Sequence, residues 1–115
     1  MTGFRLVPLH LHGAFELLVG LALMGAPFAF GLSDAAIVAG LATGAIVTGL
    51  ALRVAIGDDI DISAHYAADI ALVAGLIAGA VVLALVGDPV GAFVFVTAAI
   101  AALVLNVTTR YSARR

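Results

Sequence analysis

The sequence contains no cysteine and no tryptophan, and it is poor in charge. Without cysteine the chain has no disulfide and no thiolate ligand for a metal ion. Only 10% of its 115 residues are charged and 64% are hydrophobic, whereas an average soluble domain is about 25% charged. Proteins that bind nucleic acid carry clustered lysine and arginine, and the net charge of −2 gives no reason to expect such binding here. We therefore expect a small membrane protein that lies in the lipid bilayer and has no nucleic-acid partner.

Four long apolar runs follow one another along the chain, separated by short polar turns. A helix needs about 20 mostly apolar residues to cross roughly 30 Å of hydrocarbon. The runs therefore predict an all-α fold, a four-transmembrane-helix bundle that forms one integral membrane domain over residues 1–115. Two tandem helical hairpins, at about 10–56 and 63–109, would make up the bundle. The predicted spans are 12–32, 35–56, 64–86 and 90–107.

A polar stretch, "GDDIDIS", separates the two predicted hairpins. Aspartate and serine are favoured directly before a helix, because their side-chain oxygens accept the free N–H groups of its first turn. We therefore expect Asp61 or Ser63 to cap the third span.

The basic residues indicate how the bundle lies in the membrane. They occupy the N-terminal tail, the end of the second span and the C-terminal tail, which four spans place on one side. These residues are Arg5, Arg53, Arg110, Arg114 and Arg115. Because basic residues are enriched on the cytoplasmic side of membrane proteins, we predict cytoplasmic termini and an inner-membrane location.

Small residues and one proline indicate how the helices pack. Helices in lipid associate largely through small residues that allow close backbone approach. The pairs Gly40 with Gly44 and Gly75 with Gly79 have the required spacing of four residues. We predict that at least one of these pairs lies at a helix contact. Pro27 falls inside the first run, where its missing N–H predicts a kink or the end of the regular helix near Ala26.

The two halves of the chain resemble each other after a shift of about 53 residues. Each half has a histidine, a carboxylate four residues later, a long apolar run, a turn with aspartate and a second apolar run. The shift aligns His12 with His65, Glu16 with Asp69 and Arg53 with Asn106. An even number of spans separates the halves, so the pattern predicts a parallel pseudo-repeat about an axis along the membrane normal.

The first half also resembles a known family. The stretch "GLALMGAPFAFGLSDAAIVAGLATGAIVTGLAL" is similar to the SPW-repeat family of bacterial membrane proteins, which are built from two-helix units. Pro27 matches the central residue of the Ser-Pro-Trp triplet, and "FGLSD" at 30–34 matches the turn that follows it. The resemblance covers roughly residues 17–52, and the second half departs from the motif. It implies the hairpin architecture and a bacterial membrane protein, and it implies no chemistry.

Six polar residues are expected to share one layer of the bundle at its cytoplasmic end. Residues four apart lie on one face of a helix, and a charged group deep in lipid costs about 2.5–3.5 kcal/mol on insertion scales. Such residues therefore normally face the protein interior and have partners. The candidate layer consists of His12, Glu16, Arg53, His65, Asp69 and Asn106.

Four interpretations of this layer remain open from the sequence. In the first, the layer is structural: Glu16 pairs with Arg53, and Asp69 bonds Asn106 or a histidine. The others are a divalent metal site such as Zn²⁺ or Fe²⁺, a haem b with two histidine ligands, and a path for protons or small solutes. The metal site would use His12, Glu16, His65 and Asp69, and the haem would use His12 and His65. No continuous polar line crosses the apolar runs, which disfavours the path.

These observations lead to one main functional prediction and one alternative. The sequence shows no nucleophile–base set and no phosphate-binding loop, so we do not expect an enzyme. We predict a structural or accessory role without a cofactor, in a homo-oligomer or as a subunit of a larger membrane complex. The alternative is a binding protein or carrier that uses the histidine–carboxylate layer.

Overall fold

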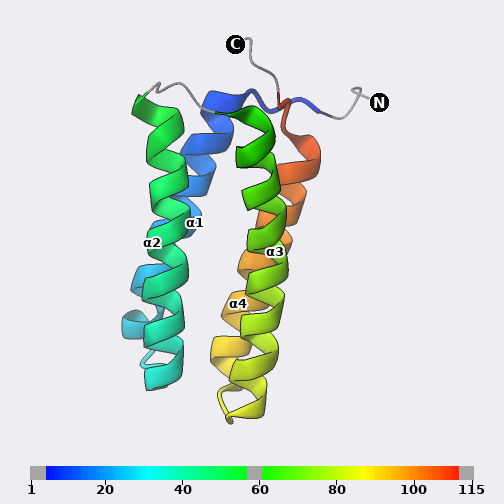
Figure 1. The fold of residues 1–115 in the computed structure, drawn as a ribbon. Coiled ribbons are helices and arrows are strands. Elements are labelled where there is room, and N and C mark those ends of the chain that lie inside the picture. The colour runs from blue at the N-terminus through cyan, green and yellow to red at the C-terminus, as the bar shows by residue number, and fades with distance from the viewer. Residues whose placement is uncertain (1–4, 57–60, 112–115) are drawn as a thin grey trace.

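The computed structural model describes residues 5–56 and 61–111 and contains four helices (Figure 1). All four are long and apolar enough to cross a membrane, which confirms the predicted all-α transmembrane bundle. The helices are α1 (Leu9–Ala29), α2 (Asp34–Ile56), α3 (Ile62–Leu85) and α4 (Pro89–Thr108).

The first helix begins earlier than predicted and ends earlier too. It starts at Leu9 rather than at residue 12, directly after Pro8, and it ends at Ala29 rather than at residue 32. Of the two outcomes expected at Pro27, an end near Ala26 is not found, because the helix continues through Pro27 to Ala29, and the kink stays a prediction. The proline lies close enough to the C-terminal end that only the last turn follows it.

In both hairpin turns the preceding helix ends in the same backbone conformation. Gly31 and Gly87 have φ values of 61° and 87°, a left-handed conformation that glycine adopts without steric cost. The N–H of Leu32 donates to the carbonyl of Pro27 at 2.9 Å, and the N–H of Asp88 donates to Leu83 at 2.8 Å. These are the wrapped C-terminal hydrogen bonds of a Schellman motif. The two hairpins thus repeat each other in the backbone of their turns.

The N-terminal ends of α3 and α4 are capped by aspartates. Asp61 accepts hydrogen bonds from the N–H groups of Ser63 and Ala64 at 3.1 and 3.2 Å, so it is Asp61 that caps the third helix. Asp88 accepts the N–H of Gly91 at 2.8 Å. Both caps satisfy helical donors that have no partner within the helix.

The helices are arranged as two hairpins placed side by side (Figure 1). Packing is most extensive within each hairpin, α1 with α2 and α3 with α4, and less extensive where α1 meets α4 and α2 meets α3. The start of α1, the end of α2, the start of α3 and the end of α4 all lie at one end of the bundle. At this end the backbones of Val7 and Thr109 meet in a short parallel bridge. We call this end of the bundle the terminal end.

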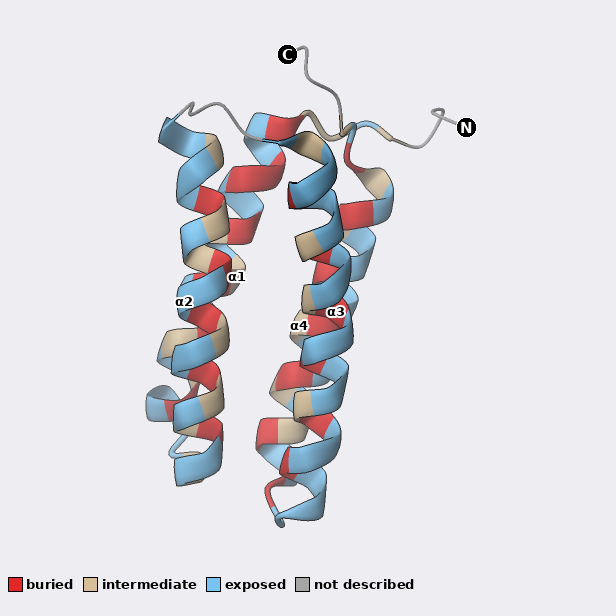
Figure 2. Cartoon of the chain, viewed as in Figure 1, coloured by how far each residue is buried: buried red, intermediate tan, exposed pale blue. Residues whose placement is uncertain are grey.

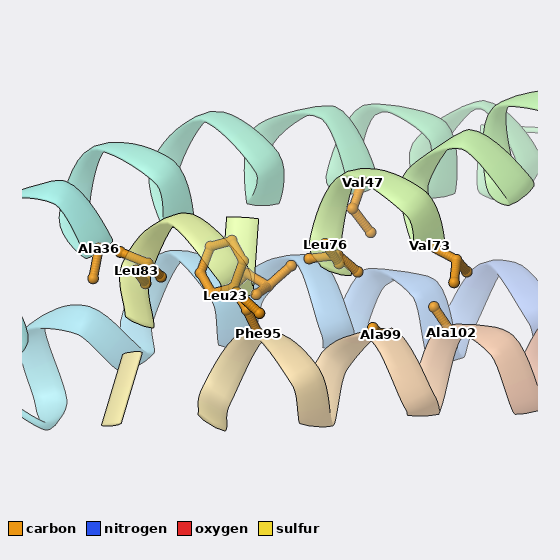
Figure 3. Packing of buried hydrophobic residues seen from close by; sticks show 10 residues of the cluster. Leu23, Ala36, Val47, Val73, Leu76, Leu83, Phe95, Ala99 and Ala102 are labelled. Carbon is orange, nitrogen blue, oxygen red and sulfur yellow. The ribbon is translucent and has the colours of Figure 1, made fainter. Parts of the chain in front are cut away.

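The buried residues form a narrow stripe on each helix, and the outer faces are exposed and apolar (Figure 2). Figure 3 shows the apolar core that fills the bundle between the hairpins. Its buried members are Leu23, Ala36, Val47, Val73, Leu76, Ala80, Leu83, Phe95, Ala99 and Ala102. Exposed leucine, isoleucine, valine and phenylalanine on all four helices fit a surface that faces lipid tails.

A polar contact joins the two hairpins at the end opposite the termini. The carboxylate of Asp88 accepts hydrogen bonds from the hydroxyl of Ser33 at 2.5 Å and from its backbone N–H at 3.2 Å. The Ser33 hydroxyl bond, together with the N–H of Gly91, lowers the pKa of Asp88 below its ordinary value. The carboxylate is therefore anionic at neutral pH, and it holds the first hairpin turn against the start of α4.

Gly40 and Gly44 allow α2 to approach α1 closely. A Cβ added at Gly40 would lie 2.5 Å from the Leu23 carbonyl, and one at Gly44 would lie 2.7 Å from the Gly20 carbonyl. Because Pro27 has no N–H, the carbonyl of Leu23 lacks its usual helical donor. The Gly40 backbone lies against this carbonyl, where a weak Cα–H···O contact is available to it.

The second glycine pair is used differently from the prediction. A Cβ at Gly79 would lie 2.9 Å from the ring of Phe95, so this glycine makes room for an aromatic side chain of α4. Gly75 is exposed, and a Cβ added there would meet no other atom within 4 Å. Within the described residues Gly75 therefore lies on the outer face of α3 and makes no close contact with a neighbouring helix.

Replacing Gly44 by valine should destabilise the bundle, because the new side chain has no space between α1 and α2. Overpacking of this kind typically costs about 1–3 kcal/mol. Gly75→Val is the matched control, since it adds the same atoms on an open face. The measurement is the unfolding midpoint in a fixed detergent. Equal midpoints for the two variants would contradict the assigned contact.

Candidate metal centre

Two pairs of ionisable side chains converge at the terminal end of the bundle. His12 and Glu16 come from α1, and His65 and Asp69 come from α3. One ligand atom from each of the four residues lies within 4.8 Å of all the others. All four residues are buried, with between 0% and 6% of their surface exposed.

The helices place the pairs at the same height. Within each pair the residues are four apart, so they lie on one face of their helix, one turn from each other. Since α1 and α3 both start at the terminal end, their equivalent residues meet at one level (Figure 1). The two helices belong to different hairpins, and the cluster therefore joins the hairpins through side chains.

Each histidine lies near both carboxylates. The Nε2 atom of His12 is 3.0 Å from Asp69 Oδ2 and 3.5 Å from Glu16 Oε2. The Nε2 atom of His65 is 3.5 Å from Asp69 Oδ2 and 3.5 Å from Glu16 Oε1. Each of these four contacts joins a histidine nitrogen to a carboxylate oxygen, and together the contacts close a small ring of ligand atoms.

Although these nitrogen and oxygen atoms lie close together, several of them form no hydrogen bond. Neither Nε2 atom has a hydrogen-bond partner of acceptable geometry within the described residues, and Glu16 Oε1 and Asp69 Oδ1 also lack one. A buried polar atom without a partner costs about 1–3 kcal/mol, and more when the group is charged. The four residues thus present unsatisfied ligand atoms to one another in a dry interior.

Thr109 fixes which nitrogen of His12 carries a proton. The Thr109 hydroxyl donates its single hydrogen to the carbonyl of Leu105, at 2.6 Å. Its contact of 2.7 Å with His12 Nδ1 must then have the ring N–H as donor and the hydroxyl oxygen as acceptor. A neutral His12 therefore carries its proton on Nδ1. Its Nε2 lone pair is left available toward the carboxylates.

Asp69 is held from the side of α4 and the residues after it. Tyr111 donates its hydroxyl to Asp69 Oδ2 at 2.7 Å, and Asn106 donates its amide to the Asp69 backbone carbonyl at 3.2 Å. Burial and the bond to the Asp69 carboxylate raise the pKa of Tyr111 above its ordinary value. Tyr111 is therefore a neutral hydrogen-bond donor at physiological pH.

Five of the six residues predicted to form the polar layer come together, and Asn106 contacts the backbone of Asp69 rather than its carboxylate. Arg53 is exposed and lines an open cavity of about 310 Å³ that borders the cluster at His65 and is also lined by Leu50, Asp61 and Ala64. The carboxylate of Glu16 contacts the two histidines. The pairing of Glu16 with Arg53 stays a prediction.

Two residues of the site were not expected from the sequence. Thr109 has no motif around it, and Tyr111 in "RYSARR" has the pattern of an interfacial anchor. Their part in the site depends on the segment after α4 lying beside Val7, which no local pattern indicates. The one available signal is their position next to Asn106, the repeat equivalent of Arg53.

The four nitrogen–oxygen contacts approach the ligand spacing of a tetrahedral metal site, and the four ligand atoms, one from each residue, lie within a wider 4.8 Å of one another. A tetrahedral ion with bonds of about 2.0–2.1 Å separates its ligand atoms by about 3.3–3.4 Å. The four nitrogen–oxygen distances are 3.0, 3.5, 3.5 and 3.5 Å. Two imidazoles and two carboxylates are also a common ligand set for divalent transition metals.

A haem fits this geometry poorly. The imidazole centroids of His12 and His65 are 5.9 Å apart, and Asp69 Oδ2 lies near both Nε2 atoms. A porphyrin between the two rings would have to displace both carboxylates from the centre of the cluster. The arrangement of side chains thus favours a single small ion over a large cofactor.

Comparisons of this chain with protein-family models, with curated proteins and with solved structures found no match. The SPW-repeat resemblance of the first half therefore stays a prediction.

Proposed function

We propose that this chain is a small integral membrane protein that binds one divalent transition-metal cation through His12, Glu16, His65 and Asp69. The observation that carries the proposal is the convergence of four buried ligand atoms within 4.8 Å. Both histidine Nε2 atoms in this group lack hydrogen bonds in the described part of the chain.

Charge balance supports a cation at this position. Two carboxylates in an apolar interior are costly unless positive charge compensates them. Asp69 and Glu16 are 1% and 4% exposed, so water solvates their carboxylates very little. A divalent ion with two neutral imidazoles and two carboxylates makes a neutral site. The same ion satisfies both bare Nε2 atoms.

The ligand set narrows the choice of metal. Imidazole suits zinc, iron and related ions, carboxylate suits harder ions such as manganese, and soft Cu(I) prefers sulfur. The chain has no cysteine, and the described cluster contains no methionine. Zn²⁺, Fe²⁺ and Mn²⁺ therefore fit the mixed nitrogen and oxygen set best.

The ion is held rather than carried across the membrane. Beyond the cluster, the buried core consists of apolar residues such as Leu23, Leu76 and Phe95. A cation passing this region would lose its ligands in a low-dielectric interior, at a high free-energy cost. The support is thus for a resident ion that ties together α1 and α3.

A resident ion is compatible with the accessory role and location predicted from the sequence. The arginines Arg5, Arg53 and Arg110 favour a cytoplasmic terminal end in the inner membrane. An apolar groove of about 390 Å³ between α1 and α4, lined partly by Ala22, Ala26 and Ala98, would suit a further helix or a second copy. Native mass spectrometry that found only monomers would contradict this role.

Purified protein, stripped with a chelator and titrated with Co²⁺ in lipid nanodiscs, should bind one ion per chain. Co²⁺ reports its ligand geometry through visible absorption. His65→Ala should weaken binding by more than the roughly 10–100-fold loss typical of residues behind the ligands, because it removes a ligand itself.

The control is His10→Ala, which removes an exposed histidine close to the same end of the bundle. This variant should bind Co²⁺ as the wild type does. A wild type that binds no Co²⁺, Zn²⁺ or Mn²⁺ would refute the proposed function. So would equal losses in the His10 and His65 variants, because binding would then not depend on the cluster.

A further inference from the structure

The residues after α4 form a strap over the cluster. We use "C-terminal strap" for residues 109–111. The strap is held by the N-terminal segment: Val7 donates its N–H to the Thr108 carbonyl at 3.0 Å, and Arg110 donates its N–H to the Val7 carbonyl at 2.8 Å. The Arg5 guanidinium donates to the carbonyl of Thr109 at 2.9 Å. The strap therefore has a defined docked position at the terminal end.

Both side chains that the strap directs inward contact ligand residues. Thr109, which is 0% exposed, accepts from His12 Nδ1, and Tyr111 donates to Asp69 Oδ2. The Tyr111 ring also lies edge-on to Tyr66 and His12, with centroid distances of 4.6 and 5.3 Å. One ligand from each helix is thus oriented by the same short segment.

We propose that docking of the C-terminal strap and binding of the cation are coupled, with Thr109 and Tyr111 as positioning residues. The inference rests on the proposed function and adds regulation of the same site. Groups behind metal ligands fix ring orientation and tautomer, and their loss typically costs 10–100-fold in metal affinity. An undocked strap would free His12 and Asp69 to turn away from the common centre.

The coupling must act in both directions. If the docked strap raises the affinity for the cation, the cation stabilises the docked strap by the same factor. Anything that pulls the strap away, such as a partner that engages the segment beside it, would then release the ion. The strap lies at the end of the bundle where both termini lie, outside the four apolar helices.

The test compares Thr→Val changes at neighbouring positions. Thr109→Val and Tyr111→Phe should each weaken Co²⁺ binding about 10–100-fold and alter its visible spectrum. Thr109→Ser keeps the hydroxyl and should restore wild-type binding. Thr108→Val is the matched control, because the Thr108 hydroxyl contacts carbonyls of its own helix, Val104 and Leu105.

The reciprocal effect is measured by hydrogen exchange at the Arg110 amide. Zn²⁺ should slow this exchange about tenfold or more in the wild type, and less in Tyr111→Phe. Tyr111→Phe keeps the aromatic ring, so it remains informative if Thr109→Val does not fold. A wild type that binds the ion, with unchanged affinity in both variants and unchanged Arg110 exchange, overturns the coupling alone. A wild type that binds no ion overturns the proposed function and the coupling with it.

Discussion

Charged groups inside a membrane bundle need compensation from within the protein, and this constraint explains the arrangement of the terminal end. Glu16 and Asp69 sit on helices that start at the same side, so both carboxylates reach one level. His12 and His65, which lie one turn away on the same two helices, each contact both carboxylates. The hairpins meet through this cluster at the terminal end, through the apolar core along their length and through the Asp88–Ser33 contact at the opposite end. The proposed cation at the centre would give all four side chains a partner at once.

The remainder of the bundle is held by close packing and by hydrogen bonds at its edges. Gly40 and Gly44 bring α2 against α1, and Phe95 fills the space that Gly79 leaves. At the far end Asp88 bonds Ser33 across the hairpins. In lipid, where apolar surface gains little from association, such shape-matched contacts and polar links supply much of the specificity. The cluster and the Asp88 contact thus join the two hairpins at opposite ends.

Much of this architecture follows from composition and spacing, because the bilayer permits few alternatives. Four apolar runs determined the spans, and the spacing of four residues within each pair placed His12 with Glu16 and His65 with Asp69. A cap by Asp61 or Ser63 followed from their position before an apolar run, and the structure assigns it to Asp61. The roles of Thr109 and Tyr111 did not follow, since they depend on a non-local bridge to Val7. Gly75 shows the same limit: spacing identifies a face of the helix but does not say what covers it.

X-ray absorption at the zinc edge of protein loaded with one Zn²⁺ per chain tests the central claim most directly. The account predicts two imidazole nitrogens and two carboxylate oxygens at about 2.0–2.2 Å. The imidazole signal should diminish in His65→Ala. A shell of oxygens alone, or a spectrum unchanged by that substitution, would contradict the assignment of His12, Glu16, His65 and Asp69 as a single metal centre.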